Sequence, residues 1–281
     1  MQFGPVVRMA AAIAVLSVMD AVIKGLSAAY PTFQVAFLRF LCGSLIATGV
    51  ACVTRPGWPS RETAAANGLR AVIALVTALT FFYALGQLPL AETLVLSFLA
   101  PMFIAFLGAV FLKERVDGRI LAALAVGFGG TLVVVFGPSG ETGPPRSLTG
   151  VAAALASALA YALSIVLLRS RAQRDKPMHI VLFQNIGPAI LAAPLASWVW
   201  QPVDPTHLAW FGLMGILGVT GHILMVSAFA RAPAARLAPL EYTALIWAAL
   251  IGFGVFNEVP TWATVAGGTL IVAAAVLTSR R

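Results

Sequence analysis

The chain has 281 residues, of which 60% are hydrophobic and only 10% are charged, and its mean hydropathy is +0.95. This composition excludes a water-soluble globular protein of this size. A net charge of +8 would favour nucleic acid if the basic residues shared one soluble surface. They lie instead in short breaks between apolar runs, so we expect no nucleic-acid partner.

Apolar runs with glycine, proline or charged residues at their ends predict ten membrane-spanning helices, because about 20 apolar residues cross a bilayer. The first run is interrupted by Asp20 and Lys24 and many more runs follow it, so we interpret it as a retained helix rather than a signal peptide. In chain order, the helices are expected near residues 7–27, 33–53, 68–87, 91–112, 119–137, 148–168, 179–200, 207–230, 237–256 and 261–279.

The basic residues of the connections alternate along the chain and predict the orientation of the helices. The connections on one side of the membrane carry Arg146 alone. Those on the other side carry Arg8, Arg55, Arg61, Arg70, Lys113, Arg115, Arg119, Arg169, Arg171, Arg174, Lys176, Arg231, Arg236, Arg280 and Arg281. Because short cytoplasmic loops are enriched in Lys and Arg, we expect both termini in the cytoplasm of a bacterial-type inner (plasma) membrane.

A shift of 144 positions aligns the first half of the chain with the second without a gap. It pairs Gly43 with Gly187, Gly68-Leu69 with Gly212-Leu213, Pro89 with Pro233, Gly108 with Gly252 and Glu114 with Glu258. Each half then holds five helices, and an odd number inverts the second half in the membrane, as in many secondary transporters. We expect an all-α integral membrane fold in which two inverted five-helix repeats, 1–137 and 148–281, surround a central cavity and are joined by an external linker, 138–147.

Four segments carry a resemblance to a known family. They are Lys24 in the first helix, the run Phe37-Leu38-Arg39-Phe40, the stretch from Pro101 to Phe111-Leu112-Lys113-Glu114, and its second-half counterpart from Glu241-Tyr242 to Glu258. With the repeat, they resemble the EamA-type ten-helix members of the drug/metabolite transporter superfamily, and the overall sequence is similar to the YddG-type exporters of aromatic amino acids. The resemblance implies that each half is one EamA-type repeat and that amino acids and related metabolites are exported.

Ionisable residues inside a membrane are costly and usually face a polar interior. Asp20 and Lys24 lie four positions apart in one polar stripe and can pair, either beside the substrate or for helix packing alone. We expect Asp20, Lys24 and Arg39 to meet the charges of the substrate, since a guanidinium can bind a carboxylate through two hydrogen bonds. The alternative for Lys24 and Arg39 is that they extend to lipid head groups.

The repeat places Tyr161 and Ser164 at positions equivalent to Ser17 and Asp20, so we expect both to line the cavity from the opposite side. Aromatic rings that could stack on a planar substrate are also predicted to line it, unless they serve packing or face lipid. These rings are Tyr83, Phe98, Tyr161, Tyr242 and Trp247.

If protons drive transport, the residues predicted to carry them are Asp20, His222 and Glu241. The alternatives are a structural hydrogen bond for His222 and neutralisation of Glu241 by Arg236 or interfacial water, and a downhill facilitator needs none of them.

Four residues interrupt the predicted helices at membrane depth, namely Gly43, Pro101, Gly187 and Pro188. Such interruptions mark binding or bending points in transporters, although a membrane proline can also be a simple kink. We predict that the four act as hinges.

The sequence contains no nucleotide-binding loop, no HExxH or GxSxG motif and no Cys/His metal cluster. We therefore expect a secondary transporter without cofactor, metal or obligate protein partner, in contact only with its small-molecule substrate and membrane lipid. The predicted activity is export of small metabolites, with aromatic and other amino acids favoured, by alternating access. The alternatives are efflux of lipophilic cationic drugs by the same fold, and an integral-membrane enzyme.

Overall fold

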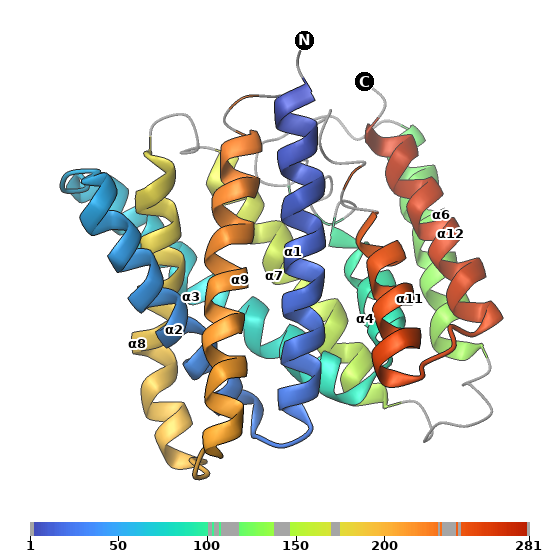
Figure 1. Ribbon diagram of the computed structural model, residues 1–281. Helices are drawn as coiled ribbons and strands as arrows, with labels where there is room; N and C mark the ends of the chain where they lie inside the picture. Colours follow the sequence, from blue (N-terminus) through green and yellow to red (C-terminus); the bar gives the residue numbers. More distant parts are fainter. Residues whose placement is uncertain are drawn as a thin grey trace.

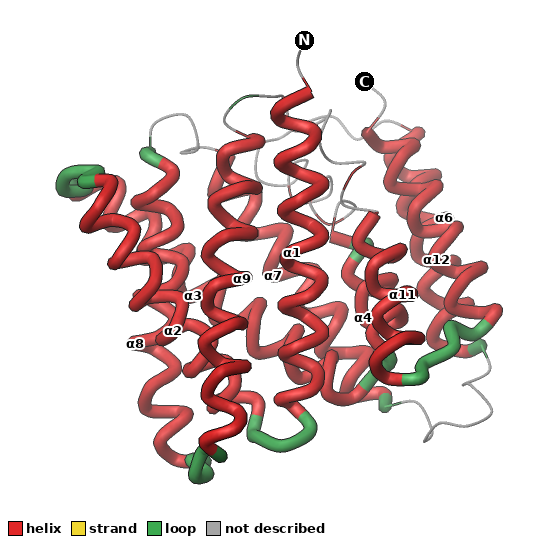
Figure 2. Tube along the Cα trace, viewed as in Figure 1, coloured by secondary structure: helices red, strands yellow, loops and turns green. Residues whose placement is uncertain are grey.

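The computed structural model describes residues 3–100, 103, 107, 118–137, 147–169, 175–229, 231, 240 and 243–279. Regular structure in these ranges is helical and includes no strand, so the all-α prediction is confirmed for this part of the chain (Figure 2). The helices are α1 (Phe3–Ser27), α2 (Thr32–Thr54), α3 (Arg61–Gln87), α4 (Leu90–Ser97), α6 (Gly118–Phe136), α7 (Leu148–Arg169), α8 (Pro177–Trp198), α9 (Pro205–Phe229), α11 (Thr243–Phe256) and α12 (Trp262–Ser279).

Six of the described helices are long and apolar enough to cross a bilayer. They provide the spans Gly4–Ser27, Thr32–Thr54, Arg61–Gln87, Leu148–Ile165, Pro177–Trp198 and Pro205–Ala228. Apolar side chains such as Leu45, Ile190 and Phe253 are each more than 60% exposed, which a soluble surface rarely tolerates in such numbers but lipid favours. The chain is a multi-pass membrane protein.

Helix α3 begins at Arg61, earlier than the predicted start at residue 68. The hydroxyl of Ser60 accepts a hydrogen bond from the backbone N–H of Thr63 (3.1 Å), and Glu62 lies in the first turn, so the N-terminus is both capped and matched to the helix dipole. The prediction was wrong here because it followed hydropathy and these first turns are polar. Arg70, which was counted among the basic residues of the connections, lies well inside α3.

Helices from the two halves of the chain pack against each other (Figure 1). Helix α1 contacts α9, α2 contacts α8 and α9, α3 contacts α7 and α8, α4 contacts α11, and α6 contacts α12. The largest buried apolar cluster includes Ile23 of α1, Phe82 of α3 and Phe211 of α9. The core therefore lies between the halves, and the start of α1 and the end of α12 lie at the same end of the bundle (Figure 1).

Two glycines allow the close contact between α6 and α12. A Cβ atom on Gly130 would lie 2.8 Å from the carbonyl oxygen of Gly267, and one on Gly267 would lie 2.6 Å from the carbonyl oxygen of Gly130. Both obstacles are backbone atoms, which cannot move aside as a side chain can. Small residues at such crossings let helix backbones approach closely in membranes.

The neighbouring glycine of α6 provides a matched control, because a Cβ atom on Gly129 would meet open space. We expect Gly130→Ala to lower the free energy of unfolding by about 1–3 kcal/mol through overpacking. Gly129→Ala should be neutral or stabilising by up to about 1 kcal/mol, since alanine favours helix more than glycine does. Thermal unfolding of the two purified variants in detergent measures the difference, and equal stabilities would contradict the assigned contact.

Candidate functional site

Arg39 of α2 lies in the interior of the bundle and is only 3% exposed. Its Nη1 donates a hydrogen bond to Oδ1 of Asn185 in α8 (2.6 Å), and Asn185 in turn donates to the carbonyl oxygen of Val181 (2.8 Å). The guanidinium carbon also lies 4.5 Å from the centre of the Phe40 ring. Arg39 therefore does not extend to lipid head groups, and that alternative is wrong.

Glycines on two helices make room for this arginine. A Cβ atom on Gly43 of α2 would collide with Oδ1 of Asn185, and one on Gly218 of α9 would lie 2.7 Å from Nη2 of Arg39. Helix α2 continues without a break through Gly43. The structure thus gives Gly43 a packing role beside Arg39, whereas its predicted role as a hinge stays a prediction.

Asp20 of α1 and His222 of α9 lie near Arg39. Asp20 is partly exposed, and the charge with which it interacts is that of Arg39. His222 donates from Nδ1 to the carbonyl oxygen of Gly218 (2.7 Å), because a carbonyl can only accept, which leaves Nε2 as the atom able to take up a proton. Its electrostatic neighbours are Arg39 and Arg70. We call Asp20, Arg39, Arg70, Asn185 and His222 the central polar cluster. They come from α1, α2, α3, α8 and α9, respectively.

Lys24 does not pair with Asp20, so that prediction was wrong. Its Nζ lies 3.0 Å from Oε1 of Glu258 and donates to the carbonyl oxygens of Leu85 (3.1 Å) and Leu88 (2.6 Å). Oε2 of Glu258 also accepts a hydrogen bond from the backbone N–H of Leu90 (2.8 Å). Lys24 thus points into the protein rather than to lipid. Lys24 and Glu258 also provide hydrogen-bond partners for carbonyls at the end of α3 and for the first N–H of α4, because backbone groups at helix ends have no partner within their own helix. We call these five residues the outer network.

Arg70 of α3 is a buried cation that the sequence analysis assigned to a connection. It is 8% exposed, its Nη1 donates to Oδ1 of Asn67 (2.9 Å), and its buried Nε has no hydrogen-bond partner among the described residues. Asn67 also donates to Oδ2 of Asp175 (2.8 Å), whose Oδ1 accepts from the Thr63 hydroxyl (2.8 Å). The carboxylate of Asp175 attracts the charge of Arg70, and Tyr161 of α7 lies near Arg70.

The predicted aromatic rings in the described part of the chain differ in their surroundings. Tyr83 is 38% exposed and its hydroxyl lies 3.1 Å from that of Thr149, whereas Phe98 is buried in an apolar cluster with Leu88 and Val151. Trp247 is 38% exposed on α11. Ser164 of α7 is buried, and its neighbour Tyr161 interacts with Arg70. Tyr242, Glu241 and Pro101 lie outside the described residues.

The two other predicted hinge positions lie in α8. A Cβ atom on Gly187 would collide with the side chain of Ala71, so this glycine permits close packing of α8 against α3. The helix runs from Pro177 to Trp198 and includes Pro188 in its interior.

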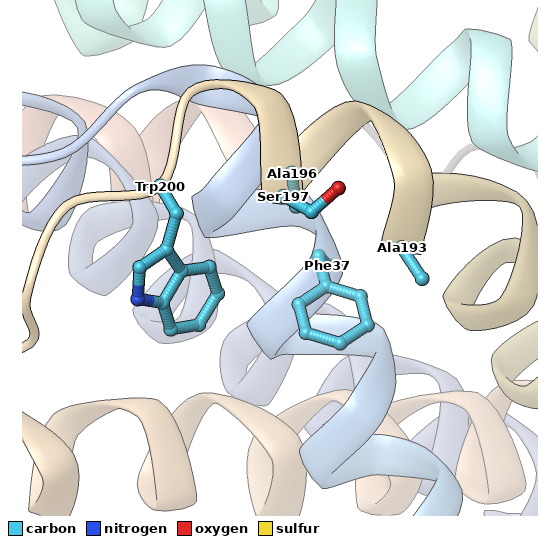
Figure 3. Close-up of a pocket in the computed structure, with 5 residues that line it drawn as sticks. All are labelled: Phe37, Ala193, Ala196, Ser197 and Trp200. Carbon is cyan, nitrogen blue, oxygen red and sulfur yellow. The ribbon is translucent and has the colours of Figure 1, made fainter.

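Two pockets open on the surface of the described part of the chain. One, of about 400 Å³, lies between α2 and α8 and is lined by Phe37, Ala193, Ala196, Ser197 and Trp200 (Figure 3). The other, of about 340 Å³, is lined by residues including Val50, Lys176 and Ile223. Neither is lined by a predicted substrate-binding residue, and no group of three or more metal-ligating side chains occurs among the described residues. The candidate site is therefore the central polar cluster.

Comparison with known families decides the class of the protein. The model of the EamA-like transporter family matches the chain twice, over residues 5–136 and 148–280. The chain belongs to the EamA-like transporter family. The EamA-type resemblance is thereby confirmed, and membership points to a transporter rather than an enzyme.

The relatives of this EamA-like protein are named for different transported molecules. The pseudopaline exporter CntI of Pseudomonas aeruginosa is 30% identical over 274 residues, which cover 94% of this chain and 92% of the relative. The S-adenosylmethionine uptake transporter of Rickettsia bellii is 26% identical over 255 residues, covering 91% and 86%. A solved crystal structure aligns with a TM-score of 0.62 at 21% identity over 96% of this chain and 98% of that one, and it supports the fold alone.

Proposed function

We propose that this EamA-like protein is a secondary transporter that exports small metabolites, with aromatic and other amino acids as the favoured class, across a bacterial-type inner membrane. The observation that carries the proposal is the buried guanidinium of Arg39, which an asparagine holds in place and which forms no direct ion pair among the described residues. A buried charge without a direct ion-pair partner is costly, even with Asp20 nearby. The carboxylate of an amino acid would supply that partner.

The neighbouring Asp20 completes the match to an amino acid. Asp20 of α1 lies near Arg39 of α2, so a zwitterionic substrate would place its carboxylate on Arg39 and its ammonium on Asp20. Lys24 already has three partners, and we assign it to the outer network instead of the substrate. Tyr83, Phe98, Tyr161, Ser164, Tyr242 and Trp247 remain predicted contacts of the rest of the substrate.

We further propose ten helices in two inverted repeats, 1–137 and 148–281, joined by an external linker, with both termini in the cytoplasm. Two observations support the repeat: the family model matches each half once, and helix packing is symmetric. The shift of 144 positions turns α1, α2 and α3 into α7, α8 and α9. It therefore exchanges the contact α1–α9 with α7–α3 and the contact α2–α9 with α8–α3, all of which are present.

Alternating access follows from the same symmetry, because inverted repeats rock about a shared site. Asp20, His222 and Glu241 are the residues proposed to carry protons if transport is coupled to them, and Gly43, Pro101, Gly187 and Pro188 are the proposed bending points.

Counterflow of labelled phenylalanine into liposomes that contain the purified protein and unlabelled phenylalanine tests the activity. We expect saturable uptake, and a pH gradient of either sign reveals whether protons are coupled to it. If the protein transports a lipophilic cationic dye but no amino acid, amino-acid export is wrong and efflux of lipophilic cations is the function.

Substitution of Gly43 tests the geometry around Arg39. The added methyl group of Gly43→Ala would displace Oδ1 of Asn185 and weaken its hydrogen bond to Arg39. We expect kcat/KM for phenylalanine counterflow to fall about fivefold, as for the loss of about 1 kcal/mol. Gly49→Ala on the same helix meets open space and should transport normally. Equal activity of the two variants would show that Gly43 does not contribute to the geometry of the site.

A further inference from the structure

Arg70 resembles Arg39 in the way it is held. Each arginine is more than 90% buried, and Nη1 of each donates to the side-chain oxygen of an asparagine, Asn67 for Arg70 and Asn185 for Arg39. Each asparagine is in turn fixed through its own amide nitrogen, by Thr63 and Asp175 or by Val181. In the described part of the chain, neither guanidinium forms a direct ion pair.

A purely structural arginine would have its donors satisfied by the protein. Asp175, whose charge interacts with Arg70, uses Oδ1 for Thr63 and Oδ2 for Asn67. Nε of Arg70 is buried and has no partner among the described residues. Because an unsatisfied donor on a buried cation costs stability, this arrangement fits a group kept ready for an acceptor that arrives with a ligand.

The two arginines also lie at nearby levels of the bundle. His222 of α9 interacts electrostatically with both Arg39 and Arg70, and Tyr161 of α7 interacts with Arg70. A Cβ atom on Gly187 would collide with Ala71, which follows Arg70 in α3. Gly187 lies two positions after Asn185, the partner of Arg39, so the two arginines lie at nearby levels of α8 inside the bundle.

We propose that Arg70 is a second anion-binding residue of the transport site, and that the substrates are amino acids or amino-acid derivatives with a second carboxylate. The inference rests on the proposed amino-acid transport. Arg39 binds the carboxylate of the amino-acid group, Asp20 binds its ammonium, and Arg70 binds the additional acid through Nε and its free edge. A lone carboxylate leaves Arg70 unsatisfied and is a poorer substrate.

Glutamate and glutamine provide the test, because they share shape and differ in the second carboxylate. In counterflow with the purified full-length protein, we expect kcat/KM for glutamate to exceed that for glutamine by at least about tenfold. Arg70→Gln should abolish this preference by raising the KM for glutamate, while glutamine transport is retained. A merely structural arginine would lower both rates together.

Two further variants keep the test decisive if Arg70→Gln folds poorly. Arg70→Lys retains the charge without the guanidinium and should keep part of the preference. Arg61→Gln removes an exposed arginine from the same helix and should leave both substrates unchanged. Equal transport of glutamate and glutamine, or transport of phenylalanine but of neither, would overturn the role of Arg70 and leave amino-acid transport standing. Absence of flux with all three would overturn the proposed function itself.

Discussion

Replacement of Arg39 by glutamine should reduce kcat/KM for phenylalanine counterflow by about 100-fold or more. The variant loses the charge that the substrate carboxylate would meet in a region from which lipid and most water are excluded. Hydrogen bonds to charged groups contribute about 1.5–3 kcal/mol each, and about 2.7 kcal/mol corresponds to a factor of 100. Initial rates in proteoliposomes with equal amounts of protein give the measurement.

Two variants distinguish binding from folding in this prediction. Arg39→Lys keeps the positive charge but cannot donate two parallel hydrogen bonds, so we expect an intermediate rate. Arg55→Gln removes an exposed arginine at the end of the same helix and should transport normally. If Arg39→Gln is as active as the wild type, the carboxylate does not bind to this arginine.

Helix positions could be predicted well from the sequence where apolar runs are long and continuous. Helices α1, α2, α7 and α9 lie within a few residues of the expected ranges. The start of α3 was missed because its first turns are polar and are stabilised by the Ser60 cap and Glu62 rather than by burial. Arg70, only two positions inside the expected start, was counted with the basic residues of the connections, and its burial was therefore missed.

The site was predictable only in part, because its contacts join residues far apart in the chain. Spacing along α1 predicted a local pair of Asp20 with Lys24, but Glu258 reaches Lys24 from beyond α11 and also caps α4. No pattern within one helix could reveal that contact. The burial of Arg39 was predictable from its depth in an apolar run, whereas its partner Asn185 lies in the other half of the chain.

Disruption of the outer network is the second change with a large expected effect. We expect Glu258→Gln to lower the free energy of unfolding by about 1–3 kcal/mol. This loss is smaller than for a fully buried ion pair because the side chains of Lys24 and Glu258 are 13% and 23% exposed. The variant keeps a polar group but loses the charge that holds Lys24. Thermal unfolding in detergent measures the loss.

The same network joins both halves of the chain, since Lys24, Leu85, Leu88 and Leu90 belong to the first half and Glu258 to the second. Its loss should therefore favour the conformation open at this end of the bundle. The probe is the variant Ser27→Cys in a Cys42→Ser, Cys52→Ser background. When Glu258→Gln is added, we expect this cysteine to react at least about tenfold faster with a membrane-impermeant maleimide. A tenfold change corresponds to a shift of about 1.4 kcal/mol between the conformations. Unchanged reactivity would limit the network to stability.

A charge exchange separates the ion pair from its backbone contacts. In the double variant Lys24→Glu, Glu258→Lys, the charges still attract, but the new glutamate faces the carbonyl oxygens of Leu85 and Leu88, and the new lysine faces the N–H of Leu90. Both encounters place like partial charges together, because carbonyls only accept and N–H groups only donate. We therefore expect the exchange to be no more stable than Glu258→Gln alone. Recovery of wild-type stability would show that the attraction between the two side chains, and not their capping of α3 and α4, stabilises this end of the bundle.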